Sequence, residues 1–211
     1  MPDESPRLML FSPRIADAAA FALPLREALA GGDVAAVALD LKGLEPRGLV
    51  NAVKLLAPIV QGKGAALLIA DESESVARGG ADGVHLSDPS ALAAALDLVK
   101  SQDRIVGVGG LKLRDDAMRA AEKGVDYVLF GESRPNGGFP PLASVVERCA
   151  WWAGIFETPC IAFAPALDAV DELAATGAEF VALGEAVWTA SEGAARAVAS
   201  ALRRLSQGMT A

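Results

Sequence analysis

The sequence predicts an α/β fold, a (β/α)8 TIM barrel that forms a single domain over residues 1–211. The first observation behind this prediction is a phrase that occurs three times, as GGADGVHLSD at 79–88, KGVDYVLFGES at 123–133 and TGAEFVALGEA at 176–186. Each copy has the pattern of a helix that ends on glycine, an acidic turn residue, and a short strand that opens into a polar loop. A closed ring of βα units needs this junction repeatedly, and its chemistry sits on the loops after the strands.

The second observation is that eight strand-plus-helix units fit the chain in order. The strands are short apolar or alternating runs, predicted at Leu8–Phe11, Val34–Leu41, Ala65–Ala70, Gly83–Leu86, Ile105–Val108, Tyr127–Phe130, Cys160–Phe163 and Phe180–Leu183. The helices fall between them, at 15–30, 46–61, 73–79, 89–100, 113–123, 141–153, 166–176 and 186–206. An open doubly wound sheet is the alternative, but we would expect it to have fewer strands and longer helices.

Signals at the helix ends agree with these boundaries. Pro89 and Pro141 stand where a first helical turn tolerates proline, and Asp71, Asp88 and Ser133 stand in the loops that precede helices. Glycines close four helices before a strand, at positions 31, 80, 124 and 177. We expect residues 1–6 and 207–211 to be frayed, and no linker divides the chain into domains.

Composition is the third observation. The chain is 52% hydrophobic with only 5% aromatic residues, which is typical of small-residue helices packed on parallel strands. A chain of 211 residues buries about 70% of its unfolded surface, so folding needs neither a disulfide nor a metal. We therefore expect Cys149 and Cys160 to be reduced and buried.

The negative net charge limits the kinds of molecule that the protein is expected to bind. A net charge of −8 argues against nucleic acid and against anionic membranes, since either would need a basic face. No signal peptide and no apolar run of about 18 residues is apparent, so we expect a cytoplasmic protein. A small phosphorylated ligand stays compatible with an acidic chain, because backbone N–H groups can bind phosphate.

Several polar residues fall at predicted strand ends. His85, the only histidine, ends the fourth strand, and a buried structural imidazole and a substrate-binding role are equally compatible with that position. Lys42 follows the second strand, either as a solvated side chain or as a contact to a ligand phosphate. Asp71 and Asp88 could hold Mg²⁺ together with substrate phosphates, but capping of the following helices is the simpler interpretation of both.

Two further loops are candidates. The glycine-rich segment 131–140 contains Glu132 and one cation, Arg134, and has the composition of a lid or of a long turn. The last two strand ends, with Ala164 on one and Gly184 and Glu185 on the other, lie where such barrels bind phosphate through main-chain N–H groups. Gly184 permits close approach of a ligand to the backbone, whereas Pro165 removes one donor.

The chain resembles the thiamine-phosphate synthase family and its close relatives, the thiazole tautomerases. The resemblance covers almost the whole chain and depends on A-D-G-V-H-L at 81–86, V-G-V-G at 106–109, G-V-D-Y-V-L-F-G at 124–131 and G-A-E-F-V-A-L-G-E-A-V at 177–187. It implies a (β/α)8 barrel that binds a phosphorylated thiazole. For the synthases it also implies a pyrimidine diphosphate whose diphosphate leaves with the help of Mg²⁺.

The resemblance carries site residues only in part. The second-strand pattern Gln-x-Arg-x-Lys becomes Ala38, Asp40 and Lys42, and the third-strand Asn-Asp becomes Ala70–Asp71. Ser90 aligns with the second metal aspartate, although Asp88 lies close enough to substitute. Other family groups are replaced as well: the serine after the fifth strand by Gly109, the Thr-x-Thr-Lys loop by 134–138, and the paired glycines after the seventh strand by Ala164–Pro165.

Three hypotheses follow. The first is a synthase-type enzyme that uses Lys42, Asp71 and Asp88 around Mg²⁺, with His85 and Gly109 at the substrate. The second is proton transfer on a thiazole phosphate with Glu132 as base, because Glu132 stands where the tautomerases have a histidine. The third is a non-catalytic or regulatory protein that binds a small phosphorylated heterocycle. An unrelated phosphate-binding barrel ranks lower, and the oligomeric state, a homodimer included, stays open.

Overall fold

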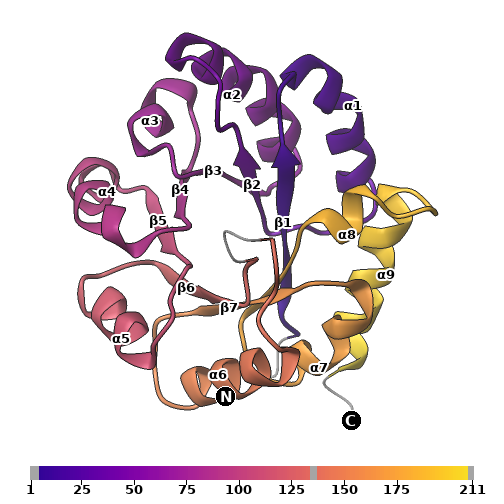
Figure 1. The fold of residues 1–211 in the computed structure, drawn as a ribbon. Coiled ribbons are helices and arrows are strands. Elements are labelled where there is room, and N and C mark those ends of the chain that lie inside the picture. The colour runs from indigo at the N-terminus through magenta and orange to yellow at the C-terminus, as the bar shows by residue number, and fades with distance from the viewer. Residues whose placement is uncertain (1–4, 134–136, 209–211) are drawn as a thin grey trace.

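A computed structural model of the chain describes residues 5–133 and 137–208 and forms a closed barrel of eight parallel strands, drawn in Figure 1. Each strand pairs with the next one in the chain, and β1 pairs with β8 to close the ring. The strands are β1 (Arg7–Arg14), β2 (Ala36–Asp40), β3 (Ala66–Ala70), β4 (Gly83–Leu86), β5 (Ile105–Val108), β6 (Tyr127–Phe130), β7 (Cys160–Ala164) and β8 (Phe180–Leu183). The predicted (β/α)8 barrel is therefore confirmed, and the open sheet was the wrong alternative.

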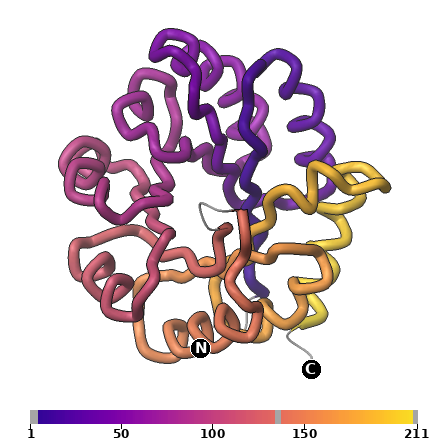
Figure 2. Tube along the Cα trace, in the orientation of Figure 1, coloured from indigo at the N-terminus to yellow at the C-terminus, as the bar shows by residue number. Residues whose placement is uncertain are grey.

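Helices surround the barrel on the outside. They are α1 (Ala18–Leu29), α2 (Pro46–Gln61), α3 (Val76–Gly79), α4 (Leu92–Val99), α5 (Arg114–Glu122), α6 (Leu142–Ala153), α7 (Val170–Ala174), α8 (Glu185–Trp188) and α9 (Ala194–Gln207). Figure 2 shows the chain making one circuit, so that its first and last helices, α1 and α9, become neighbours.

Several predicted boundaries differ from the structure, among them the end of the first strand and the extent of the last helix. The first strand continues beyond Phe11 to Arg14 through an irregularity in its pairing with β2. The helix predicted over 186–206 is two helices, because the chain leaves the helical conformation after Trp188 and re-enters it at Ala194. Gly193, directly before α9, has a φ of 90°, which disfavours other residues. Gln207 is the last residue of α9 and not a frayed one, while 209–211 lie outside the described residues.

The acidic residue of the repeated phrase has a structural role at the amino-terminal edge of the barrel. Leu67 N–H donates to Asp82 Oδ2 (2.7 Å), Val106 N–H donates to Asp126 Oδ2 (2.8 Å), and Cys160 N–H donates to Glu179 Oε2 (2.8 Å). Each acid thus satisfies a main-chain donor on the preceding strand. The repeat is a device for joining neighbouring strands.

The core has two layers. The larger one lies between strands and helices, and a smaller one fills the barrel interior with Met9, Ala38, Leu68, Tyr127, Leu129, Ile161, Phe163 and Ala182. Cys149 and Cys160 are buried free thiols, as predicted, and the hydrogen bond between them together with burial raises the pKa of Cys160. Among the described residues, no helix is both long and apolar enough to cross a membrane.

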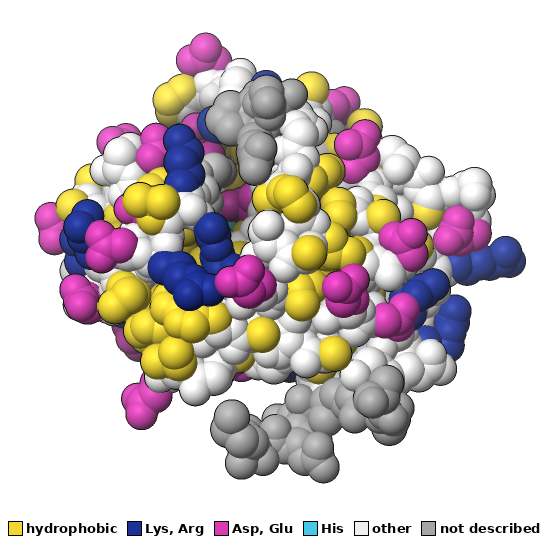
Figure 3. All heavy atoms as spheres, turned by 60° about the horizontal axis from the view of Figure 1, so that its bottom comes forward, with side chains coloured by type: hydrophobic (Ala, Val, Ile, Leu, Met, Phe, Trp, Pro, Cys, Tyr) yellow, Lys and Arg dark blue, Asp and Glu magenta, His cyan; other side chains and the backbone are white. Residues whose placement is uncertain are grey.

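Charges of both signs share the face drawn in Figure 3. Lys and Arg side chains are interspersed there with Asp and Glu side chains, and hydrophobic side chains gather between them at the lower left. The cations on this face therefore form no continuous basic stripe of the kind that follows a nucleic-acid backbone.

Candidate functional site at the carboxyl ends of the strands

His85 lies at the centre of a hydrogen-bonded chain near the carboxyl ends of the strands. Its side chain is fully buried, with Nδ1 2.9 Å from the hydroxyl of Tyr127 and Nε2 2.8 Å from Oε1 of Glu132. Gly110 N–H donates to the other carboxylate oxygen, Oε2, at 3.1 Å. The side chain of Glu132 is 16% exposed, so this chain of groups runs from the barrel interior to the surface of the site.

Two glycines of the V-G-V-G segment make room for this chain. An added Cβ at Gly107 would lie 1.9 Å from the ring of Tyr127, and one at Gly109 would lie 1.6 Å from Oε2 of Glu132. Real Cβ atoms do not approach other atoms so closely. The predicted substrate residue Gly109 therefore adjoins Glu132, and the carboxylate fills the space that a side chain at position 109 would need.

Lys42 and Asp71 meet at the ends of β2 and β3. Lys42 Nζ lies 3.0 Å from Oδ2 of Asp71, and Ser87 donates to the same carboxylate through its backbone N–H (2.7 Å) and its hydroxyl (2.8 Å). Burial raises the pKa of Asp71, but these donors and the Lys42 charge outweigh it, so the pKa lies below its ordinary value. Asp71 stays ionised at neutral pH and does not cap the helix that follows it.

Asp40 has its own cation. The β1 extension brings Arg14 opposite Asp40, with Nε of Arg14 3.5 Å from Oδ2 of Asp40. Lys42 N–H donates to Oδ1 of Asp40 at 3.0 Å. The arginine of the second-strand family pattern is absent from β2, but Arg14 on the neighbouring strand supplies a positive charge beside Asp40. The sequence did not predict this extension of β1, because Ser12–Pro13–Arg14 lacks the alternation of apolar residues that marks a strand.

Asp88 is a helix cap at this edge. Its Oδ1 accepts a hydrogen bond of 2.8 Å from Ser90 N–H, and this hydrogen bonding lowers the pKa of the exposed carboxyl group. Within the described residues, no three His, Cys, Asp or Glu side chains gather into a metal site. Mg²⁺ is often held by one or two carboxylates and by substrate phosphates, so the ionised Asp71 suits a single ligand position. The metal role of Asp88 stays a prediction.

The predicted phosphate-binding residues lie at the ends of β7 and β8. Ala164 is buried beside Leu183, Gly184 follows directly, and Glu185 begins the short helix α8 with an exposed side chain. An added Cβ at Gly184 would lie 3.0 Å from the ring of Phe163, so glycine here lets an aromatic ring approach the backbone. Phosphate binding at this place stays a prediction.

Aromatic rings line the same end of the barrel, and sequence reasoning missed them. Phe11 packs edge-on against His85 (4.9 Å between centroids) and against Phe163 (5.6 Å), and Phe139 stacks on Phe163 at 5.8 Å. Phe139 lies in the predicted lid segment 131–140, of which 134–136, with Arg134, are outside the described residues. Alternation along the strands could have indicated the inward-facing rings, but not their contact with His85.

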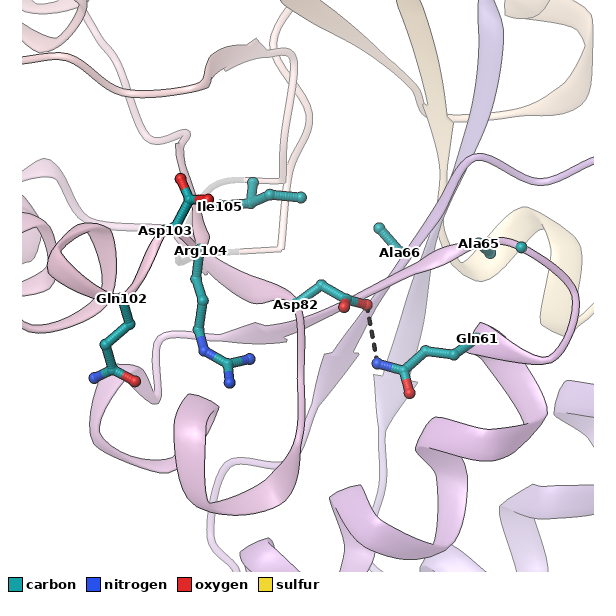
Figure 4. A pocket seen from close by; sticks show the side chains of 9 residues that line it. Gln61, Ala65, Ala66, Asp82, Gln102, Asp103, Arg104 and Ile105 are labelled. Carbon is teal, nitrogen blue, oxygen red and sulfur yellow. Dashed lines mark hydrogen bonds between the residues drawn. The ribbon is translucent and has the colours of Figure 1, made fainter.

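The opposite end of the barrel has a hollow of a different kind. Figure 4 shows its lining, in which Gln61 Nε2 donates to Asp82 Oδ2 at 3.1 Å. Gln61 also donates to the carbonyl of Gly80, and a guanidinium nitrogen of Arg104 donates to the carbonyl of Ala81. These side chains hold the turn that precedes β4, and the chemistry of such barrels belongs to the other end.

A family model described as thiamine monophosphate synthase matches residues 8–187. The chain belongs to this family. It is 37% identical to a thiamine-phosphate synthase of Rhodospirillum centenum over 195 aligned residues. This alignment covers 92% of this chain and 94% of that protein. The corresponding protein of Hyphomonas neptunium is 32% identical over 202 residues, covering 91% and 90% of the two chains.

A solved structure supports the fold. Thiamine phosphate pyrophosphorylase from Pyrococcus furiosus superposes with a TM-score of 0.79 over 96% of each chain, at 20% sequence identity. The barrel is thus shared over nearly the full length of both chains. The family resemblance in the sequence is confirmed by the family model and by the two relatives.

Proposed function

We propose that the protein joins a pyrimidine diphosphate to a thiazole phosphate and releases diphosphate, with a site that has diverged from the synthase pattern. The observation behind this proposal is the contact between Lys42 and Asp71. These are the two residues of the second-strand and third-strand patterns that the chain retains, and they lie 3.0 Å apart. A lysine ammonium and an ionised carboxylate suit opposite tasks at a diphosphate, since one binds phosphate and the other can bind a cation.

The retained residues have distinct roles in this proposal. Lys42 would bind the departing diphosphate, and Arg14 stands on the neighbouring strand as a second cation. Asp71 would hold Mg²⁺, which supplies charge neutralisation to the leaving group. Ser87, which binds both oxygens of Asp71, fixes the direction of that carboxylate. We include a cytoplasmic location in the proposal, because Cys149 and Cys160 are free thiols.

The test is release of diphosphate from the two substrates in the presence of Mg²⁺. We expect turnover by the wild type and a loss of about 100-fold in kcat/KM for Lys42→Ala, since one charged contact to the leaving group disappears. Lys54→Ala, on the exposed side of α2, is the matched control and should keep full activity. Turnover no higher than that of denatured protein rejects the proposal, and ligand binding without turnover supports a non-catalytic binding protein.

The contact between Glu132 and His85 favours a second candidate, proton transfer on a thiazole phosphate. A carboxylate held by an imidazole at 2.8 Å can act as a base toward a bound ligand. Glu132→Gln should then lower the rate of tautomerisation of the thiazole phosphate about tenfold or more. An unchanged rate rejects this candidate.

A further inference from the structure

Helices α5 and α6 are joined on the outside of the barrel by an arginine that stacks on a tryptophan. The guanidinium carbon of Arg114 lies 4.5 Å from the centre of the Trp151 ring, and Nη2 of Arg114 donates to Oε1 of Glu147 at 2.8 Å. The Trp151 ring also packs edge-on against Phe156, with 5.3 Å between the centroids. These contacts hold a large, partly exposed aromatic ring in one orientation at the surface.

Further apolar side chains are exposed around this contact. Ile155, in the turn after α6, is 65% exposed, and Phe156 beside it is partly exposed. Met118, which is 37% exposed, lies one turn after Arg114 on α5. Figure 3 shows hydrophobic side chains gathered at the lower left, in the region where Figure 1 places α5 and the end of α6. Trp, Phe, Met and Arg are the residues enriched at the centre of protein interfaces.

The charges on these two helices balance. The segments 112–124 and 142–157 carry five basic and five acidic side chains, whereas the whole chain has a net charge of −8. Two exposed ion pairs lie here, Arg114 with Glu147 and Arg119 with Asp115. Two copies of an acidic chain repel each other, but this face adds no net charge to that repulsion.

A second copy of the chain is the partner that this balance of charge favours. In a two-fold interface both copies present the same surface, so that surface has to carry both signs of charge around an apolar centre. A basic partner would find more negative charge elsewhere on the chain, and an acidic partner would need a basic face. We propose that the α5–α6 face, made of Arg114, Met118, Trp151, Ile155 and Phe156, is the two-fold interface of a homodimer.

The proposed interface lies away from the mouth of the barrel. α6 ends where the chain turns back toward the start of β7, so Trp151 and Ile155 lie toward the amino-terminal edge of the strands. Both mouths stay open in such a dimer, and the inference does not depend on the proposed function. The apolar centre is small beside the roughly 800 Å² per partner of a standard interface, so we expect a dissociation constant of about 1–100 μM.

Sedimentation equilibrium of the full chain, over a concentration series from about 1 to 300 μM, tests the inference. We expect the mass to rise from that of the 21.6 kDa monomer toward twice that value. Ile155→Asp places a charge in the apolar centre and should raise the dissociation constant about tenfold or more. Leu23→Asp on α1 is the matched control, because Leu23 is 64% exposed, and it should leave the dimer intact.

A second variant keeps the test decisive if Ile155→Asp does not fold. Met118→Glu on α5 should weaken the dimer in the same way, and circular dichroism checks that each variant is folded. A wild type that stays monomeric throughout the series overturns the inference. A dimer that tolerates the substitutions at 155 and 118, or that dissociates as readily in Leu23→Asp, overturns it as well. The readout is mass, so it stands apart from the assay of diphosphate release.

Discussion

At the mouth of the barrel, three glycines each lie against a large side chain that takes the space a Cβ atom would need. Gly109 and Glu132 are one such pair, since the carboxylate occupies the place of a side chain at 109. The same holds for Gly107 and Tyr127, and for Gly184 and Phe163. At 107 and 109 an added Cβ would overlap the neighbouring side chain, whereas at 184 the ring of Phe163 would have to move only slightly. All three glycines lack the left-handed φ that would favour glycine by itself, so the neighbouring side chain is the reason for glycine here.

The pair Gly109 and Glu132 gives a prediction at this scale. Gly109→Ser should lower the free energy of unfolding by about 1–3 kcal/mol, since the new Cβ forces the Glu132 carboxylate from its hydrogen bonds. Urea denaturation measures the change. Adding Glu132→Ala should restore part of the loss, and Gly48→Ser, where the nearest atom to an added Cβ is 4.0 Å away, is the control. Equal losses in the single and double variants contradict the steric explanation.

Strands are joined by side chains as well as by their ladders. Asp126 N–H donates to the carbonyl of Val106 and Val106 N–H donates to the carboxylate of Asp126, each at 2.8 Å. Asp82 forms the same reciprocal pair with Leu67. The acidic position of the repeated phrase therefore acts between elements, whereas the glycine before it acts within the turn.

Removing one of these joints should destabilise the fold. Asp126→Ala leaves the N–H of Val106 without its acceptor, and we expect a loss of about 1–3 kcal/mol in the free energy of unfolding. Asp126→Asn keeps an acceptor oxygen and should recover most of it. Lys100→Ala is the first control, because it removes the ion pair of Asp126 and keeps the hydrogen bond to Val106. Asp97→Ala is the second control, because it removes an exposed acid on α4. A loss of stability in Lys100→Ala as large as that in Asp126→Ala would mean that the ion pair with Lys100, and not the hydrogen bond to Val106, stabilises the fold.

For the whole molecule, local patterns predicted much of the fold and less of the site. Eight strands could be predicted because each is a short apolar run with a glycine or turn signal before it, as at Gly83–Leu86. The contact of His85 with Glu132 spans 47 positions and the end of β1 at Arg14 depends on pairing with Asp40. Neither contact produces a periodic pattern in the sequence, so only the three-dimensional structure shows them.

The response of the whole molecule to acid combines two opposing effects. A net charge of −8 at neutral pH makes the chain repel itself, and protonation of exposed carboxylates relieves this repulsion as the pH falls. Asp71 acts in the other direction. Its folded pKa lies below the ordinary 3.8, so its contribution to stability is complete above that value and is lost as the pH falls through the folded pKa.

Comparing the wild type with Asp71→Asn isolates the second effect. At neutral pH the variant should be less stable, because Lys42 loses its ionised partner and Ser87 donates to a neutral amide. The difference in free energy of unfolding should shrink as the pH drops below about 3.8 and Asp71 takes up a proton. Urea denaturation at a series of pH values measures it, with Asp97→Asn as an exposed control that should show little difference throughout. A gap between wild type and Asp71→Asn that stays constant into strong acid would mean that the carboxylate charge does not hold the three strand ends together.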